Sequence, residues 1–75
     1  MSAGETLRRS AMLAALSDDS SWVRMSALEA LIAVPRLTRA DISTIRALKH
    51  DTDPMVRERV EVTLRNIRLR RDPAA

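Results

Sequence analysis

Residues 19–28 read DSSWVRMSAL and residues 51–60 read DTDPMVRERV, so one short pattern occurs twice in the chain. In both stretches an acidic turn precedes a Val-Arg pair that opens an amphipathic segment. Shifting the first stretch by 33 residues places the pair Val23-Arg24 on Val56-Arg57. An additional shift of one position within the turn aligns Asp19 with Asp51. An internal period of this length is typical of an α-solenoid, in which one helical unit is repeated, although amphipathic helices also match by chance.

The composition favours helices and excludes several kinds of site. The 75 residues include one Gly, one aromatic residue, one His and no Cys. Sheets need β-branched and aromatic segments bounded by turns, and the sequence lacks them. Without Cys, and with a single His, the chain has no disulfide, no thiolate metal site and no imidazole cluster. We therefore predict one all-α domain with no metal ion and no cofactor.

Helix-start signals divide the chain into four helices. Ser20 is a candidate N-cap, and Thr38 with Asp41 three residues later is close to a capping box. Asp53 followed by Pro54 gives the clearest start, because Pro needs no N–H group at the first helical position. The predicted helices cover residues 5–17, 21–33, 39–49 and 54–70.

The four helices group into two units, over about residues 5–34 and 38–70, with a short tail at 71–75. Within these units the stretches LSDDSSWVRMSALEALIAV and LKHDTDPMVRERVEVTLRNI resemble the second halves of two HEAT-like repeats, which are helical repeats of the PBS-lyase and armadillo type. The resemblance implies an all-α fold in which the four helices form two antiparallel pairs, a short two-repeat α-solenoid.

In such repeats the acidic residue of the turn and the Arg after Val are mostly structural. The first copy departs from the pattern, because it lacks the Pro of the second copy and has Trp22 near that place. The resemblance implies a structural ladder of ion pairs, and not a catalytic site, for Asp19, Asp51, Arg24 and Arg57.

The second predicted helix carries two apolar stripes. In a stack of two repeats this helix is sandwiched, so we expect it to bury one stripe against its own pair and the other against the next pair. The stripes are Val23, Ala27, Leu31 and Val34 on one side and Met25, Leu28 and Ile32 on the other.

The last predicted helix also carries two apolar stripes. One spans an arc of about 80° at 100° per residue, wide enough to face the core, and consists of Val56, Val60, Leu64 and Ile67. The other recurs every seven residues, at Met55, Val62 and Leu69, and the chain ends shortly after it. This outer stripe either packs back on the second helix or forms an interface with another protein or with a second copy of the chain.

The preferred interpretation of the outer stripe is a protein interface. Its basic rim would set orientation and association rate. Trp22, at a helix start, suits an interface anchor and equally a core position. The predicted interface residues are Met55, Val62, Leu69, Arg59, Arg65 and Trp22. The predicted function is that of a small interaction module or adaptor that binds a larger protein, with self-association as a further option.

The basic end of the chain supports a competing interpretation. Residues 1–53 carry seven basic and seven acidic side chains, whereas residues 54–75 carry six Arg against three acidic side chains. HEAT-like proteins that bind DNA are a precedent, and the corresponding phosphate contacts here are Arg57, Arg65, Arg68 and Arg71. Against nucleic acid, Glu61 is spaced to pair with Arg57 and Arg65, and the chain has no aromatic stacking surface. A solvated basic face, or arginine use set by a GC-rich genome, explains the same residues.

Catalysis and membrane insertion have little support in the sequence. His50 stands beside Asp51 in a turn, but Asp53 is engaged as a helix cap and a turn His is commonly just exposed. The first residues show no signal-peptide pattern, and no apolar stretch approaches the roughly 18 residues of a membrane span. We predict a cytoplasmic, non-enzymatic protein that does not insert into a membrane.

Overall fold

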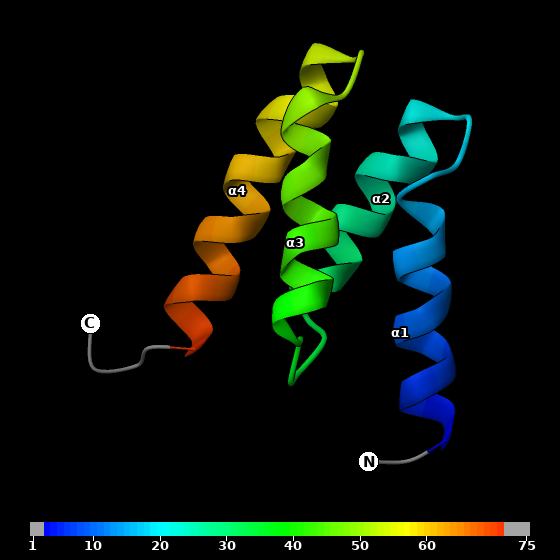
Figure 1. The fold of residues 1–75 in the computed structure, drawn as a ribbon, viewed down its shortest axis with the longest axis vertical. Helices are drawn as coiled ribbons and strands as arrows, with labels where there is room; N and C mark the ends of the chain where they lie inside the picture. The colour runs from blue at the N-terminus through cyan, green and yellow to red at the C-terminus, as the bar shows by residue number, and fades with distance from the viewer. Residues whose placement is uncertain (1–2, 72–75) are drawn as a thin grey trace.

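The computed structural model describes residues 3–71, and this part of the chain forms four α-helices with no strand (Figure 1). The prediction of an all-α fold is confirmed. A single turn of 3-10 helix, η1, follows the third helix directly. The elements are α1 Ala3–Ala15, α2 Ser21–Leu31, α3 Arg39–Ala47, η1 Leu48–His50 and α4 Pro54–Arg71.

Two of the three predicted helix starts have the expected side-chain caps. The Thr38 hydroxyl accepts a hydrogen bond from the Asp41 N–H at 3.1 Å, and the Asp41 carboxylate accepts one from the Thr38 N–H at 2.9 Å. At the start of α4 the Asp53 carboxylate accepts a hydrogen bond from the Met55 N–H at 2.8 Å. The caps satisfy N–H groups that have no partner within the helix, and so they fix where α3 and α4 begin.

The start of α2 differs from the prediction. Ser20 has the extended backbone of an N-cap, but its hydroxyl makes no capping hydrogen bond. Its own N–H instead donates to the Asp18 carboxylate at 2.8 Å. The turn before α2 is therefore closed by the side chain of Asp18, two residues earlier.

The helix ends also shift from their predicted positions. The segment predicted as the end of the first helix forms a tight turn, in which the Ser17 N–H donates to the Ala14 carbonyl. After Leu31 the Ala33 N–H donates to the Ala30 carbonyl in the same manner, so α2 ends two residues before the predicted limit. Hydrogen bonds of this i to i−3 type are the usual way in which a last helical turn tightens.

The connection between α2 and α3 inserts an apolar side chain into the core. Arg36 has a left-handed backbone with φ 60°, a conformation that costs a non-Gly residue about 1–2 kcal/mol. The following Leu37 is buried. The Arg70 guanidinium, from the far end of α4, donates to the carbonyls of Ile32 and Val34. These contacts satisfy carbonyls that the end of α2 leaves unpaired.

The helices lie in two layers. In Figure 1 α2 and α4 run side by side in one direction, and α1 and α3 lie in front of them and run the opposite way. Helix α2 packs against both α1 and α4, and α4 packs against α3 and η1. The body measures 32 × 31 × 17 Å, as expected for two layers of helices about 10 Å apart.

The core lies between these layers. On α4 the predicted core stripe is confirmed at Val56, Val60 and Ile67, and Leu64 is half-buried. On α2 the prediction that both stripes are buried is wrong for Val23, which is 40% exposed. Helices α1 and α4 cover α2 on the side of its buried residues, and Val23 lies outside that arc. The buried apolar residues are Leu16, Met25, Ala27, Leu28, Leu31, Leu37, Ile45, Val56, Val60 and Ile67.

No helix within residues 3–71 combines the length and the apolar character needed to cross a lipid bilayer. The cytoplasmic location stays a prediction.

Candidate functional site

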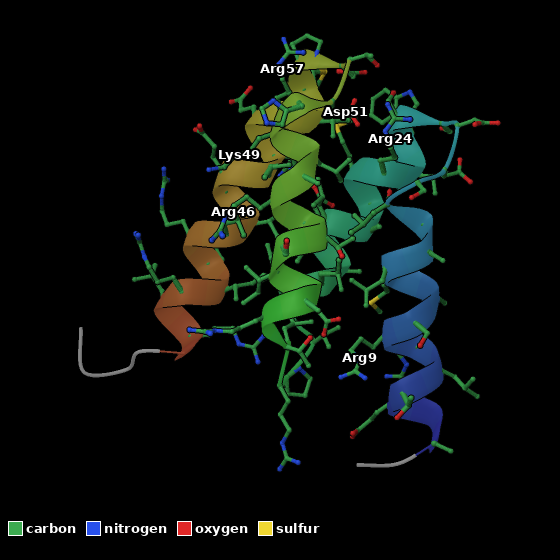
Figure 2. All side chains as sticks on the ribbon, in the orientation of Figure 1. Arg9, Arg24, Arg46, Lys49, Asp51 and Arg57 are labelled. Atoms are coloured by element: carbon green, nitrogen blue, oxygen red, sulfur yellow. The ribbon has the colours of Figure 1, made fainter. Side chains whose placement is uncertain are left out.

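A bidentate ion pair joins the two halves of the chain at the N-terminal ends of α2 and α4. The Arg24 Nε donates to Asp51 Oδ2 at 2.8 Å, and its Nη2 donates to Asp51 Oδ1 at 3.0 Å (Figure 2). Both side chains are almost completely covered. The hydrogen bond from Arg24 lowers the pKa of the Asp51 carboxyl, and the carboxylate raises the pKa of the guanidinium. Both shifts favour the charged form of the pair.

The turns before α2 and α4 repeat the same hydrogen bonds at equivalent positions. The Arg24 Nη1 donates to the Asp18 carbonyl at 2.8 Å, and the Arg57 Nη1 donates to the Asp51 carbonyl at 2.7 Å. The Asp18 carboxylate accepts a hydrogen bond from the Ser20 N–H, and the Asp51 carboxylate accepts one from the Asp53 N–H. In each turn the donor is two residues after the acidic residue. Asp19 contributes its backbone carbonyl, which accepts a hydrogen bond from Arg24 Nη1 at 3.1 Å.

This geometry corrects the predicted alignment of the two turns. Asp18, and not Asp19, takes the place equivalent to Asp51, because the two turns have equal length and need no shift. The predicted ladder residues Arg24, Arg57 and Asp51 all take part in these contacts. Their polar groups are occupied by structural hydrogen bonds, and His50 beside them is exposed. The described residues contain no group of three potential metal ligands.

A second feature is a set of apolar side chains on α2 and α4 that the core does not bury. Trp22 is 73% exposed, Met55 55% and Leu69 56%, and Val62 between them is half-buried. Trp22 and Met55 occupy the second position of α2 and of α4. We call these four residues the apolar face. Met55 and Leu69 lie about 21 Å apart along the helix axis, at 1.5 Å per residue, so the face runs most of the length of α4.

The basic residues predicted at the rim of this face have different positions. The Arg59 guanidinium lies 3.1 Å from the Glu29 carboxylate, an ion pair that bridges α4 and α2. Arg65 is exposed and lines a groove on the other side of α4. Arg59 therefore lies near the apolar face but is already paired with Glu29, whereas Arg65 lies on the side of α4 that faces α3.

That groove lies between α3 and α4 and has a volume of about 450 Å³. Figure 2 shows Arg46 of α3 and Lys49 of η1 projecting to the side on which α4 lies. Sequence reasoning missed both, because neither belongs to the C-terminal arginine cluster. We call this the basic groove. Its lining residues are Ile42, Arg46, Lys49, Glu61, Leu64, Arg65, Ile67 and Arg68.

The predicted phosphate-contacting arginines therefore separate. Arg65 and Arg68 line the basic groove, whereas Arg57 is held at the turn by the Asp51 carbonyl. The Arg71 side chain lies outside the described part of the structure. The predicted pairing of Glu61 with Arg57 and Arg65 is absent, since no ion pair involves Glu61 within the described residues.

No protein-family model, no curated protein and no solved structure matches this chain. The geometry of these surfaces is therefore the basis for assigning a function.

Proposed function

We propose that this chain is a two-repeat α-solenoid fragment of HEAT-like type that works as a non-enzymatic module and binds another protein through the apolar face. The partner covers Trp22, Met55, Val62 and Leu69. A larger protein and a second copy of the chain are both partners of this kind.

The solenoid interpretation is supported by the repeated turn geometry. Equivalent hydrogen bonds at equivalent positions of the two turns are expected when one helical unit is used twice. The Arg24–Asp51 pair joins one unit to the next, as a ladder between stacked repeats would.

Protein recognition rests on one observation above all, the exposed Trp22 in the first turn of α2. Trp is enriched among residues that dominate binding energy, and Met is enriched in interface cores. The Glu29–Arg59 pair beside the face is neutral in sum, so an apolar partner surface meets no net charge there. The face therefore suits an apolar contact with a polar border.

The size of the effect follows from the exposed area. A Trp side chain buries about 150–250 Å². Covering the exposed 73% of Trp22 removes roughly 150 Å² from water, which corresponds to roughly 3–4 kcal/mol at about 25 cal/mol per Å². A domain of this length has a total stability of about 3–5 kcal/mol. The cost of association offsets part of this gross term, and the net stabilisation of the folded chain depends on the partner concentration relative to its Kd.

A non-enzymatic role agrees with how the acidic turn residues are used. Asp51 is engaged by Arg24, and Asp53 caps α4 through the Met55 N–H. A carboxylate bound in this way is not free to act as a general base or as a metal ligand.

The test is site-specific photo-crosslinking in the native lysate. A benzoylphenylalanine replaces Trp22 or Met55 in the face, and a matched control replaces Ser43, which is exposed on α3. We expect one stoichiometric protein adduct, either a larger protein or a second copy of the chain, from both face positions and none from position 43. Equal adducts from all three positions, or no adduct from the face, would show that the face is not the interface.

A further inference from the structure

The basic groove carries an inference that is independent of the apolar face. It lies between α3 and α4, and its lining combines two kinds of residue. Half-buried Ile42 and Leu64, with Ile67 beneath them, form an apolar floor. The cations stand on both sides of that floor, Arg46 and Lys49 on the α3 side and Arg65 and Arg68 on α4.

The groove holds the whole net charge of the protein. The chain has thirteen basic and ten acidic side chains, a formal charge of +3. The groove has four of the cations and one carboxylate, Glu61. The remaining residues are nine basic and nine acidic, and so they sum to zero. A positive field is therefore concentrated at one surface groove, where it attracts an acidic ligand.

The cations of the groove are also free of ion pairs with other described residues. Within the described residues, the ion pairs Arg9–Asp41, Arg24–Asp51 and Arg59–Glu29 involve no residue of the groove. An acidic ligand would therefore displace no existing partner of these cations.

The spacing of the cations fits a helix. Arg65 and Arg68 are three residues apart on α4, which gives about 4.5 Å of rise, and Arg46 and Lys49 have the same sequence spacing across the junction of α3 and η1. Acidic residues three or four apart on a helix are neighbours about 5–6 Å from each other. A helix with an apolar stripe flanked by carboxylates would place the stripe on the floor and the carboxylates against the two walls.

Nucleic acid fits the groove less well. Phosphates would use the cations but would leave the apolar floor uncovered. Sequence-tolerant binding of single strands uses aromatic side chains for base stacking. The chain's one aromatic residue, Trp22, is on α2 and does not line the groove.

We propose that the basic groove between α3 and α4 binds an acidic amphipathic helix of a partner protein, with its apolar residues on Ile42 and Leu64 and its carboxylates on Arg46, Lys49, Arg65 and Arg68. The groove lies on a different side of α4 from the apolar face, so the two surfaces can act separately.

The test measures fluorescence anisotropy with the full chain and a labelled synthetic helix of about 16 residues. Its leucines recur at i, i+3, i+4 and i+7 on one helix face and are flanked by glutamates. One control peptide has the same composition with the leucines spread around the helix, and a single-stranded DNA of similar length is the second control. We expect the patterned helix to bind more tightly than both controls. Equal binding of the permuted peptide, or tighter binding of the DNA, would overturn the proposal.

Variants locate the binding site. Lys49→Glu with Arg68→Glu should weaken binding of the patterned helix by about tenfold or more, because each attraction becomes a repulsion. The matched control, Arg8→Glu with Arg39→Glu, makes the same change of charge at exposed positions outside the groove and should weaken binding by no more than about threefold. Equal weakening by both pairs would mean non-specific attraction and would refute the groove.

Two further measurements do not depend on those variants. In wild-type protein the peptide should shift amide resonances around Ile42–Lys49 and Glu61–Arg68 in a heteronuclear NMR spectrum. Shifts centred on the apolar face would overturn the proposal. Trp22→Ser should leave peptide affinity unchanged, and loss of peptide binding in that variant would move the site to the apolar face.

Discussion

Val23 and Val56 provide a matched pair for testing how burial at equivalent helix positions affects the stability of the chain. Each is the third residue of its helix and precedes the Arg of the repeated pattern. Val56 of α4 is fully buried in the core, whereas Val23 of α2 is 40% exposed. Substituting each by Ala therefore makes the same chemical change at equivalent helix positions in two different environments.

The expected magnitudes follow from burial. Val→Ala removes two carbon groups, worth about 1.6 kcal/mol of transfer free energy when fully buried. The cavity left at Val56 adds about 1 kcal/mol, and the better helix propensity of Ala returns about 0.5 kcal/mol. Val56→Ala should therefore lower the free energy of unfolding by about 2 kcal/mol. At the partly exposed Val23 no closed cavity forms, and the same change should cost only about 0.5 kcal/mol.

Urea denaturation followed by far-UV circular dichroism measures both variants. Trp22 is a poor fluorescence reporter, because it is already 73% exposed in the folded protein. With a denaturant slope of about 1 kcal/mol per M, Val56→Ala should move the midpoint down by roughly 2 M and Val23→Ala by roughly 0.5 M. Equal shifts in the two variants would refute the placement of Val56 in the core and of Val23 at the surface.

Three further outcomes follow from the structure. In the folded protein the pKa of Asp51 lies below its ordinary value of 3.8, so the unfolded chain takes up this proton first as the pH falls. The stability from the Arg24 pair should be complete well above pH 3.8 and should be lost progressively as the pH falls through the lowered pKa of the folded state, so the gap in urea midpoint between wild type and Asp51→Asn should begin to shrink on going to about pH 3. Removing a cap, by Thr38→Ala or Asp53→Ala, should lower the thermal midpoint with a loss of about 1 kcal/mol each, because an N–H of the first turn is left without its partner. Trp22→Ser should leave the stability of the free protein within about 0.5 kcal/mol of wild type, and a larger loss would mean that this side chain is part of the core.

The candidate surfaces were only partly predictable from the sequence. The seven-residue spacing of Met55, Val62 and Leu69 identified an outer stripe, and the structure leaves its two ends exposed. The basic groove could not be predicted, since Arg46 and Lys49 meet Arg65 and Arg68 only after α3 has packed on α4. The charge count did show an excess of positive charge, but from the sequence alone this excess was assigned to the C-terminal end and not to a groove between two helices.

The sequence by itself determined the local structure. The helix starts at Thr38 and Asp53 depend on hydrogen bonds to groups within three residues, and the stripe Val56, Val60 and Ile67 depends on the period of one helix. Such features need only neighbouring residues, so a linear pattern carries them.

The tertiary structure alone decided which distant groups meet. It pairs Arg24 with Asp51 across 27 residues and brings Arg70 to the carbonyls at the end of α2 across 36 and 38 residues. It also buries Val56 while leaving Val23 exposed. These outcomes depend on how each helix is rotated against its neighbours, and that rotation is set by the packing of the whole core.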